Sequence, residues 1–171
     1  MILWHLGIGA ALVYVTLGRR RIDYRFILVG AIAPDLVDGL LGLIVFEGPS
    51  GRWIAHSLLM PVAIAVVIIV LFKAERRLSV FGLAVGWLTH LVADGMWQAP
   101  RTFLWPLFGT DFSNEPAEPY SIDLFSHPFD QVWIWAGELI GLALLAWFWV
   151  AFDLGDAARR RAFLRDGQLR A

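Results

Sequence analysis

Long apolar segments separated by short charged breaks dominate this 171-residue sequence. Each segment is close to the roughly 20 residues that a helix needs to cross the hydrocarbon core of a bilayer. Hydrophobic residues make up 58% of the chain and charged residues 17%, which is unlike an ordinary soluble domain. The pattern predicts five transmembrane segments, at about 2–18, 26–46, 53–72, 78–97 and 131–152.

We expect these segments to be helices, because hydrocarbon admits only helices and closed barrels. The continuous apolar run at 64–72 lacks the alternation of a barrel strand. The predicted fold class is therefore all-α, a polytopic helical bundle in the membrane. It forms one domain over residues 1–152, which includes a long loop at 98–130, and residues 153–171 form a basic tail.

The basic residues indicate how the bundle is oriented, since Lys and Arg are retained on the cytoplasmic side of a membrane. Twelve of the 14 Lys and Arg residues fall in the first loop, the third loop or the tail, and only Arg52 and Arg101 fall elsewhere. We therefore predict a multi-pass protein of the cytoplasmic (inner) membrane with its amino end outside and its carboxyl end inside. The proline-rich and aromatic loop at 98–130 then forms a partly apolar flap on the outer side.

Composition also excludes several classes of function. A net charge of -1 gives no support to nucleic-acid binding, which needs a basic face. The absence of cysteine removes disulfides, thiolate zinc sites and cysteine nucleophiles. Ten of the 15 acidic residues lie within the predicted spans or on the outer side, so that side is electronegative and favours a cation.

Two pairs of polar residues lie within predicted helices. His90 and Asp94 are four residues apart, so their side chains leave the same face of the helix. Asp35 and Asp38 are three apart and follow Pro34, whose ring is expected to break or kink the helix. Ionisable groups inside a membrane are costly, and they indicate a functional site.

Two further histidines, His5 and His56, fall about one helical turn inside the outer ends of their spans. With a rise of about 1.5 Å per residue, four helices bring His or Asp to one shallow layer. Mixed imidazole and carboxylate ligands suit zinc, manganese or iron, as one ion or two. The alternative is that each histidine only makes a hydrogen bond between helices. The predicted metal ligands are His5, Asp35, Asp38, His56, His90 and Asp94.

Two other charged residues are candidates for catalysis. Arg52 lies four residues before His56 and could bind a phosphate through its fork of donors, or extend to the membrane boundary beside Trp53. Glu138 could be a ligand, a general base or a partner of Arg52. His127 and Asp130 could be loop and cap residues or belong to the site.

The set of motifs resembles the YdjM-like family, which is regarded as a group of membrane-bound metal-dependent hydrolases. The resemblance runs from His5 to about residue 130. Asp38 stands where the family often has a histidine, so it would replace an imidazole ligand. The matching segments are His5, Ala33-Pro34-Asp35 with Asp38, Arg52 to Leu58, Gly86 to Asp94, and Leu104-Trp105-Pro106.

The family is thought to be distantly similar to zinc-dependent phospholipase C and to fungal zinc nucleases. The resemblance therefore implies a helical zinc phosphoesterase, and we expect it to cleave a phosphoester of a lipid or lipid-linked substrate at the outer membrane face. The alternatives are a metal-binding structural or interaction protein and, less favoured, an ion transporter. The inner halves of the predicted spans carry no ionisable residue, which disfavours a pathway across the bilayer.

Overall fold

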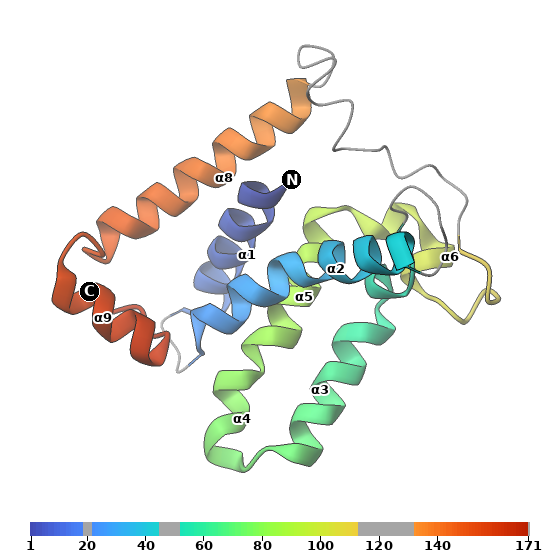
Figure 1. Ribbon diagram of the computed structural model, residues 1–171, viewed down its shortest axis with the longest axis horizontal. Helices are drawn as coiled ribbons and strands as arrows, with labels where there is room; N and C mark the ends of the chain where they lie inside the picture. Colours follow the sequence, from blue (N-terminus) through green and yellow to red (C-terminus); the bar gives the residue numbers. More distant parts are fainter. Residues whose placement is uncertain (19–21, 45–51, 113–131, 171) are drawn as a thin grey trace.

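The computed structural model describes residues 1–18, 22–44, 52–112 and 132–170. All regular secondary structure in these residues is helical, which confirms the all-α class. The long helices are α1 (Ile2–Leu17), α2 (Tyr24–Ile44), α3 (Leu59–Leu71), α5 (Gly82–Ala93) and α8 (Val132–Ala151), shown in Figure 1. The shorter elements are α4 (Ala74–Val80), α6 (Pro100–Phe103), α9 (Ala157–Asp166) and the 3-10 turns η1 (Ile54–His56) and η2 (Met96–Gln98).

The long helices overlap the predicted apolar segments, with α2 beginning two residues before its segment, and the segment at 78–97 is divided. In that segment α4 ends at Val80, α5 begins at Gly82, and the chain turns again after Ala93. Within the described ranges, α8 is the one helix long and apolar enough to cross a membrane, while α1 and α3 are shorter apolar helices. The five-span arrangement and its orientation therefore stay predictions.

At the centre of the molecule α2 and α5 cross in direct backbone contact. A Cβ atom added to Gly86 would lie 2.2 Å from the carbonyl oxygen of Ile27, and one added to Gly30 would lie 2.3 Å from that of Leu83. Only glycine fits at such distances, because no side chain can occupy this space. Gly82 and Gly86, which share one face of α5, thus form a helix-packing surface, and α2 is its partner.

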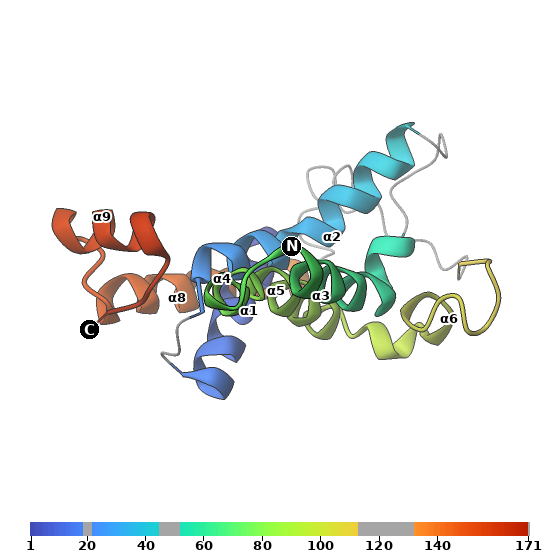
Figure 2. The same ribbon diagram turned by 90° about the horizontal axis from the view of Figure 1, so that it is seen from below.

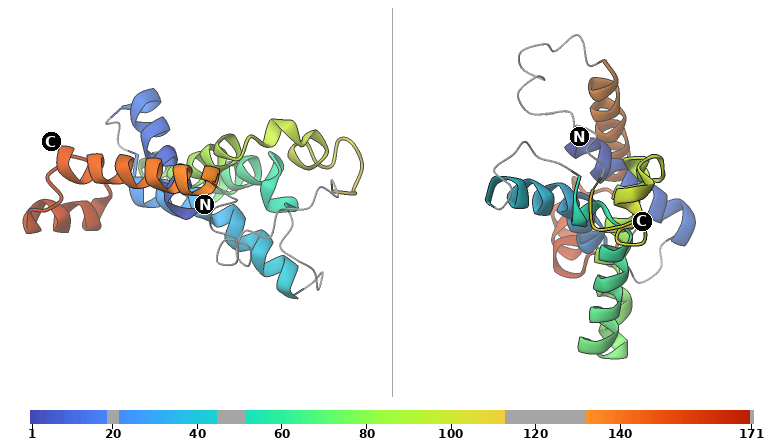
Figure 3. Two further views of the ribbon diagram at one scale, coloured as in Figure 1. Left: turned by 90° about the horizontal axis from the view of Figure 1, so that it is seen from above. Right: turned by 90° about the vertical axis from the view of Figure 1, so that its right-hand side faces the viewer.

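On one side of this central pair, α8 packs along α1, and α3 lies on the other side (Figure 3). A Cβ atom added to Gly141 would lie 2.1 Å from the carbonyl oxygen of Leu3. Glu138 Oε2 accepts the backbone N–H of Leu3 at 2.8 Å. That N–H is one of the donors that a helix leaves without a partner at its amino end. Helix α8 therefore fixes the first turn of α1.

The outward faces of α3 and α8 expose large apolar side chains. Val66, Val70, Trp133, Leu139 and Val150 are each more than half exposed. Soluble monomers rarely expose contiguous apolar surface on this scale. Contact with lipid removes the cost of exposing it to water, so these faces suit a protein embedded in a membrane.

Pro34 does not end α2, which continues as one helix from Tyr24 to Ile44. Proline removes one backbone donor and crowds the preceding turn. In the turn before Pro34, the carbonyl oxygen of Ala31 accepts a hydrogen bond from Nδ1 of His90 at 2.8 Å.

The first part of the predicted loop at 98–130 packs onto the helices. Figure 2 shows α6 beyond the ends of α3 and α5. The Leu58 backbone N–H donates to the carbonyl of Phe103 at 2.8 Å, and Phe103 packs against a buried cluster that contains Trp87 and Met96. The remainder of the loop, with His127 and Asp130, lies outside the described residues.

Candidate metal site

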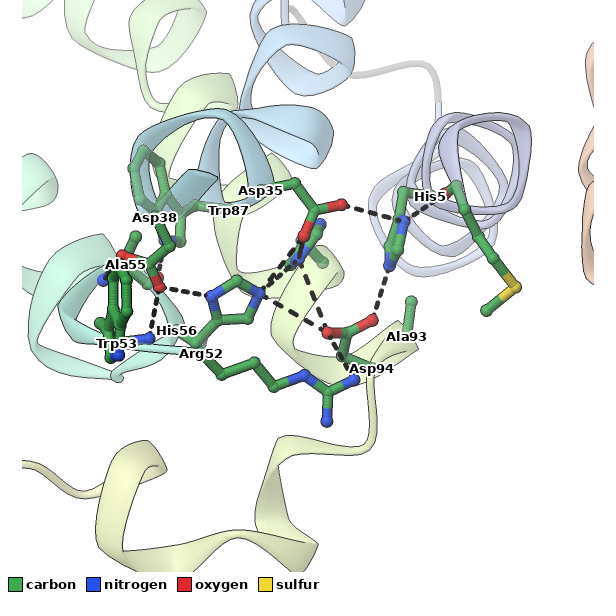
Figure 4. Close-up of polar contacts among 12 residues, drawn as sticks. His5, Asp35, Asp38, Arg52, Trp53, Ala55, His56, Trp87, Ala93 and Asp94 are labelled. Atoms are coloured by element: carbon green, nitrogen blue, oxygen red, sulfur yellow. Dashed lines mark hydrogen bonds and ion pairs between the residues drawn. The ribbon is translucent and has the colours of Figure 1, made fainter. Parts of the chain in front are cut away.

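Three separate segments bring two histidine and two aspartate side chains to one place (Figure 4). Helix α5 and the residue that ends it carry His90 and Asp94, and α2 carries Asp35. The short turn η1 places His56 beside them. One donor atom from each of these four residues lies within 4.8 Å of the other three. The structure thus brings together four of the six predicted metal ligands.

The distances between these donor atoms suit a single ion. Nε2 of His56 lies 3.3 Å from Nε2 of His90 and 3.4 Å from Oδ1 of Asp35. Nε2 of His90 lies 3.5 Å from the same Asp35 oxygen. Oδ2 of Asp94 lies 3.6 Å from Nε2 of His56 and 3.9 Å from Nε2 of His90. A tetrahedral ion with bonds of about 2.1 Å places its ligand atoms about 3.4 Å apart.

The hydrogen bonds of the two imidazoles orient their Nε2 atoms toward the group. Nδ1 of His90 donates to the carbonyl of Ala31 at 2.8 Å, and Nδ1 of His56 donates to Oδ2 of Asp38 at 2.7 Å. In the neutral ring the proton then lies on Nδ1, and Nε2 carries a lone pair. Two such lone pairs facing each other at 3.3 Å repel unless a cation lies between them. The residues present therefore fit a metal ion.

Asp38 lies behind His56 and outside the group of four donors. Besides the Nδ1 proton of His56, its carboxylate accepts the backbone N–H of Trp53 at 2.7 Å and that of Ala55 at 3.0 Å. Asp38 is buried, so these three donors supply the partners that an ionised carboxylate needs. This differs from the ligand role expected for Asp38: the carboxylate orients a ligand and fixes the turn that carries it.

His5 contacts the group from α1. Its ring stacks on that of His90, with ring centroids 4.0 Å apart. Nε2 of His5 donates to Oδ1 of Asp94 at 2.8 Å, which leaves Oδ2 of Asp94 directed toward the other donors. Nδ1 of His5 lies against the carbonyl of Met1 and 4.0 Å from Asp35. His5 therefore adjoins the four donors and holds Asp94.

The group is closed on the histidine side and open on the side of Asp35. The side chain of His90 is completely buried, whereas that of Asp35 is 46% exposed. Arg52 is also partly exposed, and its Nη2 lies 3.1 Å from Oδ2 of Asp94. A molecule approaching from outside would meet the Asp35 carboxylate and the Arg52 guanidinium.

The two predicted catalytic residues therefore occupy different places. Arg52 borders the group through its ion pair with Asp94. Glu138 accepts the Leu3 backbone N–H and is not among the four donors. Its contact accounts for an acidic residue within the apolar helix α8, because a carboxylate stabilises the amino end of a helix.

Sequence reasoning missed Trp87, which helps to position His56. Its buried indole Nε1 donates to the carbonyl of Ala55 at 2.7 Å and so fixes η1 against α5. A signal was present in the sequence. Six of the nine tryptophans lie near the predicted outer boundary, whereas Trp87 lies in the middle of a span. A buried indole N–H needs an acceptor there.

Comparison with known proteins identifies a family. The family model described as YdjM inner membrane protein matches residues 1–158, which include every residue of the candidate site. No match was found among curated proteins or among solved structures.

Proposed function

Because the chain belongs to the YdjM inner membrane protein family, we propose that it is a metal-dependent hydrolase embedded in the membrane. In this proposal it cleaves a phosphoester of a lipid or lipid-linked substrate at the outer face. The observation that carries the proposal is the group of four nitrogen and oxygen donors from Asp35, His56, His90 and Asp94. We infer that zinc is the ion, because imidazole and carboxylate ligands at tetrahedral spacing suit it.

In this proposal, different residues hold the ion and bind the substrate. A divalent ion held by the four donors would polarise a phosphoryl oxygen and activate a water molecule. Arg52 is placed to bind the phosphate, since a guanidinium offers paired donors with the geometry of phosphate oxygens. The partial exposure of Asp35 leaves an open side for the substrate.

An amphipathic phosphoester is the substrate class that this setting favours. Large apolar side chains are exposed on α3 and α8, and the family is one of inner membrane proteins. In this proposal the site therefore lies in a chain embedded in the membrane. A substrate that partitions into the lipid would reach the site by diffusion within the bilayer. The electronegative outer side would attract the ion and repel anions, and Arg52 is one of two basic residues there.

The test is hydrolysis of lipid phosphates by purified protein in nanodiscs, after metal removal and after addition of zinc, manganese or iron. We expect phosphate release that requires metal and that is lost on chelation. Stoichiometric metal without turnover of any lipid phosphate would reject the hydrolase and support a structural role for the ion. Metal flux across proteoliposomes without hydrolysis would instead support transport.

A further inference from the structure

A cavity lies next to the carboxyl end of α8, away from the candidate metal site. It has a volume of about 240 Å³. Its apolar wall comes from the segment that follows α8 and from α9, and its polar groups are two arginines and one amide. The lining residues are Phe152, Leu154, Arg159, Ala162, Phe163, Gln168 and Arg170.

The tail that lines the cavity is docked on the start of α2 (Figure 1). The Tyr24 backbone N–H donates to the carbonyl of Gly167 at 2.9 Å, and Gln168 Nε2 donates to the carbonyl of Ile22 at 3.2 Å. Leu169 joins Ile22 in a buried cluster. The segment after α9 is therefore fixed, and the cavity is part of the fold.

The two arginines retain donors for a ligand. Arg159 Nε lies 3.6 Å from Asp153 Oδ2, and its Nη1 donates to the Arg170 carbonyl at 3.5 Å. Arg170 Nη2 donates to Asp166 Oδ2 at 2.6 Å. These contacts use only part of the five N–H groups that each guanidinium carries. The guanidinium groups therefore remain able to bind an anion.

The amino end of α9 is already capped, so it does not provide the anion site. Asp156 accepts the backbone N–H groups of Ala158 and Arg159, both at 2.9 Å. These hydrogen bonds hold the pKa of Asp156 below its usual range, and the bond from the Arg159 backbone contributes most. Recognition of an anion at this cavity would therefore depend on the side chains of Arg159 and Arg170.

The position of the cavity identifies the kind of anion. Helix α8, the candidate membrane span, ends at Ala151, and the lining begins at the next residue, Phe152. The cavity thus lies where the hydrocarbon core gives way to the headgroup layer. Phenyl and leucyl side chains suit an acyl chain and glycerol, whereas two guanidinium groups suit a phosphate.

We propose that this cavity binds the headgroup of an anionic phospholipid, with the phosphate at Arg159 and Arg170 and the glycerol against Phe152, Leu154 and Phe163. The site is independent of the metal group and of its proposed chemistry. The tail carries five arginines and three aspartates from Phe152 to Arg170, which adds a favourable field for an anion.

The experiment measures lipid retained by the full chain after purification in detergent, where no membrane surface potential acts. The protein is titrated with phosphatidylglycerol or phosphatidylcholine, and bound lipid is counted by native mass spectrometry. We expect phosphatidylglycerol to bind preferentially. Arg159→Gln and Arg170→Gln should each weaken its binding about tenfold, the effect of losing one charge-assisted contact.

Matched controls separate a site from general charge. Arg161→Gln and Arg165→Gln remove the same charge from α9 but do not line the cavity, so both should retain the lipid. Ala162→Phe should fill the cavity and displace the lipid with both arginines in place. Equal loss in all four arginine variants would overturn the proposal, and so would full displacement of the lipid by inorganic phosphate at equal concentration. Thermal unfolding of each variant checks that the tail remains docked.

Discussion

The carboxylate of Asp38 accepts the Nδ1 proton of His56 at 2.7 Å and so directs the opposite ring nitrogen toward the candidate metal. The same carboxylate accepts two backbone N–H groups of the segment that carries His56. One buried acid therefore sets the tautomer of the ligand, the orientation of its ring and the path of the chain around it. Such partners of a metal ligand commonly matter for metal affinity.

We expect Asp38→Asn to weaken zinc binding about 10- to 100-fold, because an amide stabilises the ligand tautomer less than a carboxylate does. Isothermal titration with zinc would measure the change. Asp153→Asn, which alters an exposed aspartate of the tail, should bind zinc as the wild type does. Unchanged affinity in Asp38→Asn would show that this contact does not support the site.

His90→Ala should lower the metal content and abolish phosphoester hydrolysis, since it removes one of the four donors. Helix packing should survive the loss of the His90 hydrogen bond to the Ala31 carbonyl, because α2 and α5 also meet in direct backbone contact at Gly30 and Gly86. Thr89→Ala is the control on the same helix, since Thr89 lies outside the donor group and bonds only to the Gly86 carbonyl in the described contacts. Metal analysis and activity are measured on both. Full metal content with full activity would remove His90 from the mechanism.

Arg52→Gln should leave the metal bound and lower kcat/KM. The expected loss of transition-state stabilisation is about 2–4 kcal/mol, by analogy with loss of one preorganised donor. Arg101→Gln removes the other arginine of the predicted outer side, which is exposed, and should retain activity. A steady-state assay together with metal analysis separates these outcomes. If Arg52→Gln and Arg101→Gln have the same rate, Arg52 takes no part in catalysis, and its role is limited to the ion pair with Asp94.

Gly86→Val should destabilise the fold by about 1–3 kcal/mol or more, because its Cβ would lie 2.2 Å from the Ile27 carbonyl. Gly39→Ala is the control within α2, where an added Cβ meets nothing within 4 Å. Thermal unfolding in detergent would compare the two. Equal midpoints would contradict the close crossing of α2 and α5.

The orientation is tested by reporter fusions. A reporter that works only in the cytoplasm should be active when it is fused after Ala171, because twelve of the 14 basic residues fall on that predicted side. A reporter within 113–130 should report the outside. The reverse pattern would place the candidate metal site on the cytoplasmic side.

Local patterns in the sequence were sufficient for the helical class, the positions of the long helices and part of the site. The i, i+4 spacing of His90 and Asp94 predicts a shared face because helical periodicity is a property of the chain itself. Gly82 and Gly86 are also four residues apart, a spacing of small residues that lets another helix approach closely, and in the structure that helix is α2. The residue types also indicated a candidate metal site, since His and Asp within a predicted span are costly unless they are used.

The role of each residue in the site was decided by contacts between helices. Sequence spacing does not give these contacts, because they depend on how each helix is rotated and where it crosses its neighbours. Asp35 and Asp38 share a helix face, yet Asp35 is a donor and Asp38 lies behind His56. His5 holds Asp94, and Glu138 binds the start of α1. Sequence spacing determines which residues share a helix face. Tertiary packing determines which atom of a neighbouring helix each side chain meets, and that choice separates a metal ligand from the residue that positions it.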